Sequence, residues 1–291
     1  QNSAINFFKS DNVNINQFHT NQIPEMLDHI IDKGVEAVYV HIDSKNLNAL
    51  EPLIQELSIY AFNLYWVLPE TLLNESNNLI STRPVQLNSS PVYLDTNQYL
   101  LKRSLDVFGA IFILLAISPI AALVALIIKS TDRGPILYTQ LRLGQFGKEF
   151  RMFKFRSMIV NSDYSDQQVF DEDPRVTIIG KIIRKTSFDE LPQLLNVLRG
   201  EMSLVGPRPH IISETNLYSK KILRFLTRHH VKPGLTGLAQ IRARGKTNTI
   251  ELMQEKLKSD LEYISQWTFF LDIKILVNTP LSLWKNRSTN I

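Results

Sequence analysis

The spacing of apolar and polar residues changes character near residue 98, and this change divides the chain into two parts. In the first part, residues 37–42 and 63–68 have the β-branched and aromatic composition of buried strands, and residues 47–60 repeat apolar positions at helical spacing. This strand–helix–strand order predicts an α/β domain of the Rossmann-like type over residues 1–98. No glycine-rich phosphate loop follows either strand, so we expect an accessory domain rather than a cofactor-binding one.

The second part opens with an uncharged and almost wholly apolar run, residues 110–128, which is about long enough to cross a bilayer as a helix. Ser118 and Pro119 lie in its middle, where proline interrupts helical hydrogen bonding, and basic residues flank both ends. Because basic flanks favour the cytoplasmic side, we expect a re-entrant helix–break–helix over about residues 104–129. A membrane-crossing span and a buried core helix of a soluble protein are the alternatives.

The C-terminal segment mixes aromatic, apolar and basic side chains in a way that is typical of a helix at a membrane interface. The aromatic members are Trp267, Phe269, Phe270 and Trp284, and Lys274, Lys285 and Arg287 supply the charge. An ordinary core helix is the alternative, but beside the apolar run the membrane interpretation is favoured. We therefore predict that residues 99–291 form a mainly helical α/β domain that associates with a membrane.

The charge and the absence of cysteine exclude several classes of chemistry for this chain. It has 291 residues, a formal net charge of +4 and no cysteine, which excludes disulfides, thiolate catalysis and cysteine-ligated zinc. The basic excess suits an anionic lipid surface or a nucleotide substrate, but it is too small and dispersed to indicate nucleic-acid binding. The chain begins at Gln1 without a secretory signal, so we expect it to be a piece of a longer protein.

The clearest candidate for chemistry is an acid pair, Asp189 and Glu190, between arginines that include Arg184 and Arg208. Carboxylate oxygens suit a divalent cation, and guanidinium groups suit the oxygens of a phosphate ester. The same segment fits a helix-capping box that begins at Ser187, which would be a purely structural role. Pro192 would lie beyond the first turn of a helix that begins just after Ser187, which weakens that alternative, so we expect a helix that starts near Asp189 with both acids at its positive end.

Several short motifs follow one another in a fixed order along the second part of the chain. They are Lys102-Arg103-x-x-Asp106, Ser118-Pro119, Gly134-Pro135, Gln140-x-Arg142-x-Gly144-x-x-Gly147, and residues 154–158, 173–177, 187–193, 205–209 and 232–237. With them, residues 99–291 resemble the bacterial sugar transferase family, the monotopic polyprenyl-phosphate phosphoglycosyl transferases. The first part is similar to the accessory domain of the long-form members, in which transmembrane helices come first. We expect the first motif to anchor the base of the apolar helix.

The resemblance implies transfer of a sugar-1-phosphate from a UDP-sugar to a polyprenyl phosphate such as undecaprenyl phosphate, with release of UMP. Asp189 would be the nucleophile, Glu190 together with Asp189 would hold Mg²⁺, and Arg184 would contact phosphate. Further basic residues are candidates for the diphosphate or the lipid phosphate, with Arg208 and Arg175 favoured first: Lys154, Arg156, Arg175, Arg208 and Arg244. The mechanism needs no histidine, so His229 and His230 are interpreted as structural or loosely phosphate-facing.

The resemblance also implies a location, because a lipid-borne phosphate stays at the headgroup level and the site must come to it. We expect the protein to lie at the cytoplasmic face of a bacterial inner membrane. The resemblance to the long-form members also implies a homodimer. After Gln240 the chain departs from the family pattern at Arg242-Ala243 and Lys246, near the expected sugar or uridine contact. Glucose is the first choice of sugar and galactose the second, with N-acetylated or dideoxy sugars left open.

Two other functions compete with this one. A hydrolase or nucleotidyl transferase would use the same acid pair on soluble diphosphates, but it would not need the apolar run. A membrane-bound scaffold or regulator would have lost activity, although Arg184, Asp189 and Glu190 are all present. A hydrolase would release sugar phosphate without a lipid acceptor, which distinguishes it from the transferase. A scaffold would keep its biological role in an Asp189→Asn variant, whereas the transferase would not.

Overall fold

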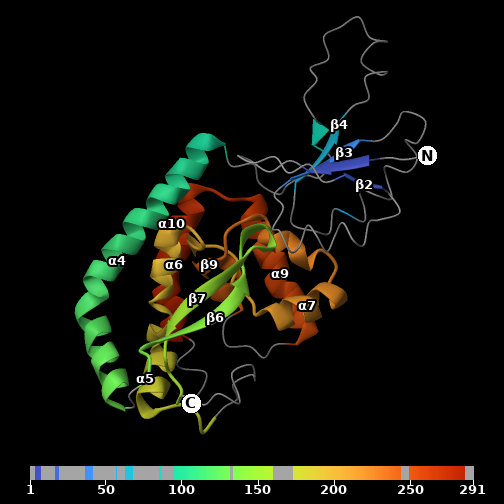
Figure 1. Ribbon diagram of the computed structural model, residues 1–291. Coiled ribbons are helices and arrows are strands. Elements are labelled where there is room, and N and C mark those ends of the chain that lie inside the picture. The colour runs from blue at the N-terminus through green and yellow to red at the C-terminus, as the bar shows by residue number, and fades with distance from the viewer. Residues whose placement is uncertain are drawn as a thin grey trace, which may run out of the picture.

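The computed structural model describes the C-terminal part of the chain almost throughout and the N-terminal part as separate strands (Figure 1). The described residues are 4–7, 17–19, 37–41, 57, 63–67, 85–86, 95–131, 134–159, 173–243 and 249–285.

The described N-terminal strands form one five-stranded sheet in the order β2-β1-β3-β4-β5. Its strands are β1 (Ala4–Phe7), β2 (Gln17–His19), β3 (Ala37–His41), β4 (Asn63–Val67) and β5 (Val85–Gln86). β3 and β4 pair in parallel, with Ala37 opposite Asn63, and the other pairs are antiparallel. Both predicted strands are therefore confirmed. Most of the predicted helix at residues 47–60 lies outside the described residues, and the Rossmann-like type stays a prediction for this mixed sheet.

The apolar run belongs to one continuous helix, α4 (Thr96–Thr131), so the expected interruption at Ser118-Pro119 was wrong. Pro119 has no N–H to donate to the carbonyl of Leu115, four residues earlier. The Ser118 hydroxyl donates to that carbonyl instead, at 2.9 Å, so the turn keeps a hydrogen bond. Figure 1 shows α4 bowed along one side of the domain. A helix can absorb a proline by bending, and the re-entrant course of the chain stays a prediction.

The outer face of α4 carries large apolar side chains that the rest of the described protein leaves uncovered. Phe108 is 71% exposed, Phe112 73% and Leu126 68%. By length and composition α4 is able to cross a membrane, and only 11% of its most apolar window is buried. A core helix of a soluble protein would be largely buried, so this exposure argues against that alternative.

The remaining elements of the second part build two small sheets within a mainly helical domain. β6 (Leu137–Leu143) and β7 (Glu149–Phe155) are antiparallel, whereas β8 (Ser203–Val205) and β9 (Gly234–Thr236) are parallel. The helices are α5 (Ile178–Thr186), α6 (Gln193–Arg199), α7 (Ile212–Lys221), α8 (Leu238–Arg242), α9 (Ile250–Ser265) and α10 (Phe269–Lys285). The short turns are η3 (Gln145–Gly147), η5 (Phe188–Glu190) and η6 (Phe225–His230). This mixture agrees with the predicted mainly helical α/β domain.

The inner face of α4 packs against the domain along both of its halves. The first half contributes Ala110 to a core shared with β7, α6, β8, α9 and α10. The second half contributes Val124 and Ile128 to a smaller cluster with Phe155 of β7 and Ile183 of α5. Phe188 of η5 packs against this second cluster, so the turn that carries the acid pair and the apolar helix contribute to one group of packed side chains.

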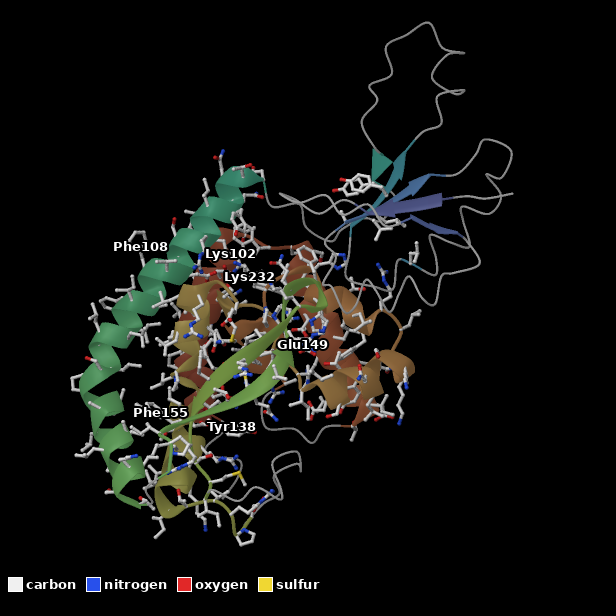
Figure 2. The ribbon with its side chains drawn as sticks, in the orientation of Figure 1. Lys102, Phe108, Tyr138, Glu149, Phe155 and Lys232 are labelled. Carbon is white, nitrogen blue, oxygen red and sulfur yellow. The ribbon has the colours of Figure 1, made fainter. Side chains whose placement is uncertain are left out.

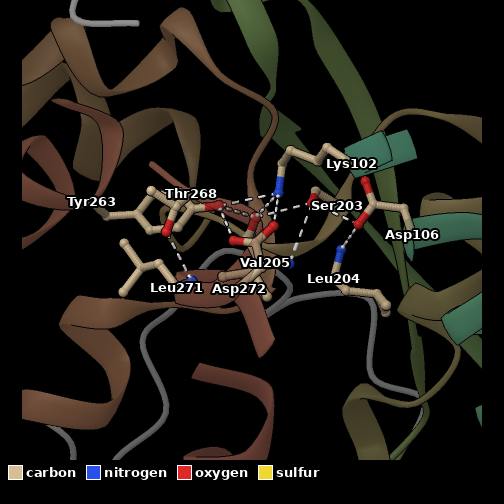
Figure 3. A network of polar contacts seen from close by, with 9 residues as sticks. All are labelled: Lys102, Asp106, Ser203, Leu204, Val205, Tyr263, Thr268, Leu271 and Asp272. Carbon is tan, nitrogen blue, oxygen red and sulfur yellow. Dashed lines mark hydrogen bonds and ion pairs between the residues drawn. The ribbon is translucent and has the colours of Figure 1, made fainter. Parts of the chain in front are cut away.

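A buried polar network ties the base of α4 to three other elements (Figure 3). Lys102 Nζ donates to Asp272 Oδ2 at 2.8 Å, to the Val205 carbonyl at 3.1 Å and to the Tyr263 hydroxyl at 3.1 Å. Asp106 Oδ1 accepts from the Ser203 hydroxyl and from the Leu204 amide, each at 2.8 Å. The first motif thus anchors α4, as predicted, and it does so on the strand that leads to Arg208.

Candidate functional site

The acid pair lies in a 3₁₀ turn between two helices. Thr177 caps α5 by accepting from the Gly180 amide at 2.9 Å, and Ser187 ends this helix in the left-handed region, with φ 60° and ψ 19°. η5 follows with Asp189 and Glu190, and α6 starts only after Pro192. Ser187 makes no capping hydrogen bond from its side chain to η5, so the capping box is not formed.

The expectation of a helix that starts near Asp189 was wrong by about one turn. Pro192 has no N–H, and it fits directly before α6, where no helical partner is needed for one. The acids therefore precede α6 instead of occupying its first turn. A non-glycine residue in the left-handed region, as at Ser187, is uncommon and turns the chain sharply just before the acid pair.

Glu190 is held by two cations. Arg208 binds it with both terminal nitrogens, Nη2 to Oε1 at 2.6 Å and Nη1 to Oε2 at 3.3 Å, and Lys154 Nζ donates to Oε1 at 3.2 Å. Burial alone would raise the pKa of Glu190, but Arg208 and Lys154 together hold it well below its ordinary value. Glu190 is therefore ionised at neutral pH and fixed in place.

Asp189 differs from its neighbour although both face the same cavity. Its residue is 8% exposed, and burial raises its pKa, with a further rise from the charge of Glu190. Lys154, Arg184 and Arg208 lower the pKa of Asp189 and so oppose this effect. A buried carboxylate with three cations nearby is poorly solvated, which favours its use as a nucleophile.

The acid pair opens into a cavity of about 340 Å³, here called the main cavity. Arg184 and Arg208 line it together with the acid pair and Ser187, and this group is called the first end of the cavity here. Arg184 is oriented by its Nε, which donates to the Ser157 hydroxyl at 2.8 Å. Two carboxylates and two guanidinium groups on one wall can bind a metal-bound diphosphate.

The remaining residues that line the main cavity come from later in the chain and are together called its far end here; apart from Ala243, a departure noted after Gln240, the sequence did not point to them as site residues. They are His210, Arg228, Ala239, Gln240, Ala243, Lys256 and Asp260. Arg228 and Asp260 form an ion pair at 2.8 Å with side chains only 3% and 2% exposed. Burial raises the pKa of Asp260 to about 6, against the charge of Arg228. Gln240 Oε1 is a buried acceptor without a hydrogen-bond partner among the described residues.

One weak signal in the sequence could have found part of this end. Lys256 and Asp260 are four residues apart, so they lie on one face of α9. Such a pair is far more often a solvated surface pair than a buried one, and Arg228 and His210 come from distant segments. Of the departures noted after Gln240, Ala243 lines the cavity, whereas Arg242 pairs with Glu262 at the exposed surface.

The structure brings together only some of the predicted phosphate-binding residues. Arg184 and Arg208 line the main cavity, and Lys154 reaches it through Glu190. Arg175 is instead paired with Asp173, at 2.9 Å from Nε and 2.6 Å from Nη2, and it does not line the cavity. Arg156 is buried beside a separate small cavity with Ile128 and Thr177, and Arg244 lies outside the described residues. Arg175 and Arg156 therefore do not line the main cavity, and their role as phosphate-binding residues stays a prediction.

The two histidines interpreted as structural are buried in η6. His229 Nδ1 lies 3.1 Å from the Gly144 carbonyl, and burial lowers the pKa of His229 to about 3. Neither histidine lines the main cavity. A neutral, buried imidazole bonded to backbone agrees with a structural role.

The carboxylate oxygens of the acid pair are the kind of ligand that Mg²⁺ prefers. Within the described ranges, no group of three or more histidine, cysteine or acidic side chains converges. Mg²⁺ usually takes one or two carboxylates and completes its shell with water and substrate phosphate. Asp189 and Glu190 supply such a pair beside a cavity, so the residues fit an ion that binds together with the substrate.

Known proteins resemble this chain over most of its length. UDP-glucose:undecaprenyl-phosphate glucose-1-phosphate transferase of Klebsiella pneumoniae is 34% identical over 94% of this chain and 59% of its own. The protein of the same name from Escherichia coli (strain K12) is 42% identical over 72% of this chain and 47% of its own. A UDP-N-acetylgalactosamine-undecaprenyl-phosphate N-acetylgalactosaminephosphotransferase of Aeromonas hydrophila is 37% identical over 65% of this chain and 44% of its own.

The chain thus spans about half the length of these curated relatives. The family model described as bacterial sugar transferase matches residues 97–286, which is more than half of the chain. This range includes α4, the acid pair and every residue that lines the main cavity. The chain therefore belongs to the bacterial sugar transferase family.

Proposed function

We propose that this chain transfers a sugar-1-phosphate, with glucose as the first choice, from a UDP-sugar to undecaprenyl phosphate. The observation that carries the proposal is the buried Asp189 carboxylate, which faces a cavity with Arg184 and Arg208 while its turn joins an apolar cluster to which the exposed apolar helix also contributes. The proposed reaction needs a soluble diphosphate and a lipid-borne phosphate to meet at one carboxylate. The turn that carries Asp189 shares an apolar cluster with α4, whose exposed face is suited to lipid.

The proposed reaction has two displacements at the same phosphorus. An Asp189 oxygen forms a bond to the sugar-linked phosphorus while the bond from this phosphorus to the UMP oxygen breaks. An oxygen of undecaprenyl phosphate then attacks the same phosphorus, and the bond to Asp189 breaks. The products are UMP and the polyprenyl-diphosphate sugar. Arg184 and Arg208 are placed to bind the non-bridging oxygens, whose charge must be stabilised in each step.

Mg²⁺ is part of this proposal, held by Glu190 with Asp189 beside it. The chemistry that the ion would supply is neutralisation of the diphosphate charge. Glu190 already has a lowered pKa, so it can accept a cation without first losing a proton. Arg208, which now binds Glu190, would then be available to the substrate phosphate.

The far end of the main cavity is proposed to receive the sugar. Among the described residues that line it, only His210 offers a ring on which a uracil base could stack, and its polar groups are of the kinds that bind hydroxyls. Gln240 Oε1 offers an acceptor, and Ala239 and Ala243 leave room beside it. Glucose is preferred because relatives named for UDP-glucose match most of the chain. Galactose and N-acetylated sugars are the alternatives, the latter in view of the N-acetylgalactosamine relative.

The exposed face of α4 supports a position at the cytoplasmic face of a bacterial inner membrane, with α4 dipping into the bilayer and returning. The curvature of α4 around its domain keeps both of its ends in contact with soluble elements. A homodimer, expected from the long-form resemblance, completes the proposal. Its test is the mass of the detergent-solubilised protein in solution.

The deciding experiment is UMP release from a panel of UDP-sugars by detergent-purified protein with Mg²⁺ and undecaprenyl phosphate. UMP should form only with the lipid and favour one sugar, and it should vanish in Asp189→Asn and after chelation of the metal. Glu255→Gln, an exposed acid on α9, is the matched control and should keep full activity. Release without lipid would favour a hydrolase. No release from any folded sample would favour a scaffold.

A further inference from the structure

A second cavity lies at the base of α4, and the proposed reaction does not use it. This base cavity has a volume of about 70 Å³ and shares no lining residue with the main cavity. Residues of two motifs that are far apart in sequence meet there, Lys102 and Arg103 from the first motif and Lys232 from the last. Figure 2 shows Lys102 and Lys232 on the inner side of α4, and Phe108 on its outer side.

The three cations of the base cavity differ in how they are satisfied. Lys102 is neutralised by Asp272 at 2.8 Å. Arg103 donates to the last carbonyls of α6, to Val197 at 2.7 Å and to Leu198 at 2.8 Å. Lys232 makes no hydrogen bond or ion pair within the described part of the chain, and its Nζ lies 5.9 Å from the centre of the Tyr99 ring. Asp106 also lines the cavity and its charge raises the pKa of Lys232, but this carboxylate is bonded to Ser203 and Leu204 and forms no ion pair with Lys232 in the described part of the chain. A half-buried ammonium that is only partly offset in this way favours an anion beside it.

The gap for this anion is next to Gly200. A Cβ atom placed on Gly200 would lie 3.6 Å from Lys232 Nζ and 3.7 Å from Arg103 Nη2. Both cations therefore border the same space, which glycine leaves open. Gly200 has φ +83°, a conformation that side-chain-bearing residues rarely adopt, so the gap is built into the end of α6.

Most of the remaining wall of the base cavity is apolar, although Asp106 and Gln145 also line it, and the apolar part continues onto the outside of α4. Val231, Ile264 and Trp267 line its interior. Tyr99 also lines it and is 49% exposed, and the next residues on α4, Leu100 and Leu101, are 56% and 47% exposed. A ligand that fits both parts has an anionic head and an apolar chain, and its charge complements that of Lys232.

We propose that the base cavity binds the phosphate of an anionic phospholipid between Lys232 and Arg103, with an acyl chain along Tyr99 and the first turns of α4. The phosphate in this proposal is distinct from the acceptor at Asp189, since the two cavities have no lining residue in common. The site would fix the depth of α4 in the headgroup layer. This inference does not depend on the transferase reaction.

The test compares phosphatidylglycerol with phosphatidylcholine in mixed micelles of the purified full chain, using thermal unfolding and native mass spectrometry. Phosphatidylglycerol should stabilise the wild type and stay bound to it, whereas Lys232→Met should retain it about tenfold more weakly, as expected for one charge-assisted hydrogen bond. Lys220→Met, an exposed lysine on α7, is the matched control and should behave as the wild type.

A second readout separates a lipid site from a structural lysine. Burial, with Arg103 next in effect, lowers the pKa of Lys232, so removing this ammonium should leave the lipid-free protein at least as stable as the wild type. Lys232→Gln serves as a second variant should the methionine variant not fold.

Three outcomes would overturn the inference. Equal stabilisation of Lys232→Met and wild type by phosphatidylglycerol would remove Lys232 from the site. Equal stabilisation by inorganic phosphate would make it a simple anion site. Displacement of phosphatidylglycerol by undecaprenyl phosphate, with a raised KM for that lipid in Lys232→Met, would assign the cavity to the acceptor.

Discussion

The two ends of the main cavity contrast in how they are built. The end with the acid pair comes mainly from one continuous stretch, with Arg184, Asp189 and Glu190 within seven residues and Arg208 a short distance on. The far end is assembled from η6, α8 and α9, and its ion pair joins residues 32 positions apart. The first end offers guanidinium groups and carboxylates that can bind a metal-bound phosphate. In the far end, the buried charges of Arg228 and Asp260 already pair with each other.

The largest expected effect concerns the stability of the far end. Asp260→Ala leaves Arg228 buried without its partner, and breaking such a pair costs about 3–5 kcal/mol. Glu262→Ala, on the same helix, removes an exposed pair with Arg242 and should cost about 0–1 kcal/mol. Thermal unfolding in detergent measures both. Equal losses in the two variants would mean that the Arg228–Asp260 pair is not buried as described.

The next effect distinguishes the arginines of the first end from one outside it. Arg208→Met should lower kcat by about 10²–10³-fold, the usual cost of losing one donor to a developing negative charge. Arg175→Met should lower it far less, because Arg175 is bound to Asp173 and does not line the cavity. Steady-state UMP release gives both values. A larger loss at Arg175 would restore that residue to the site.

A smaller effect tests the assignment of the far end to the sugar. Gln240→Met removes an acceptor at nearly constant volume and should raise the KM for the UDP-sugar about tenfold, as for one lost hydrogen bond. Inhibition by UMP, which lacks the sugar, should not change. Arg242→Gln on the same helix, outside the cavity, is the control. Weaker inhibition by UMP in Gln240→Met would place the nucleotide there instead.

The smallest effect is a shift in pH dependence. Asp189 must be ionised to attack, and burial raises its pKa, so activity should fall on acidification at a higher pH than for an ordinary aspartate. Lys154 lowers the pKa of Asp189, and Lys154→Met should therefore move the acidic limb of the kcat profile to still higher pH. A limb that stays in place or moves down would show that Lys154 does not act on Asp189.

The same contrast shows which features of the fold and of the site could be predicted from the sequence. The strands β3 and β4, the apolar helix and the acid pair were predictable because each is carried by neighbouring residues. The helical continuity at Pro119 was not, because it depends on the Ser118 hydroxyl satisfying the Leu115 carbonyl. Arg228 could not be linked to Lys256 and Asp260 from the sequence, since only the packing of η6 against α9 makes it their neighbour.

Arg175 is a different case, because the structure shows its pairing but does not test its predicted binding of phosphate. Its motif was recognised, but Asp173 two residues earlier turns out to bind it with both oxygens. An acid and a base on either side of a proline could have suggested this local pair. A motif thus indicated the family, while only side-chain geometry showed which of its charges remain for a substrate.

The most direct test of the account is to trap the covalent intermediate. The purified protein is incubated with its preferred UDP-sugar and Mg²⁺ in the absence of lipid, and the intact mass is measured beside that of Asp189→Asn. The account predicts that the wild type gains the mass of one sugar phosphate at Asp189 and loses it on addition of undecaprenyl phosphate, while the variant gains nothing. Lipid-dependent turnover without any adduct, or an equal adduct in the variant, would contradict Asp189 as the nucleophile.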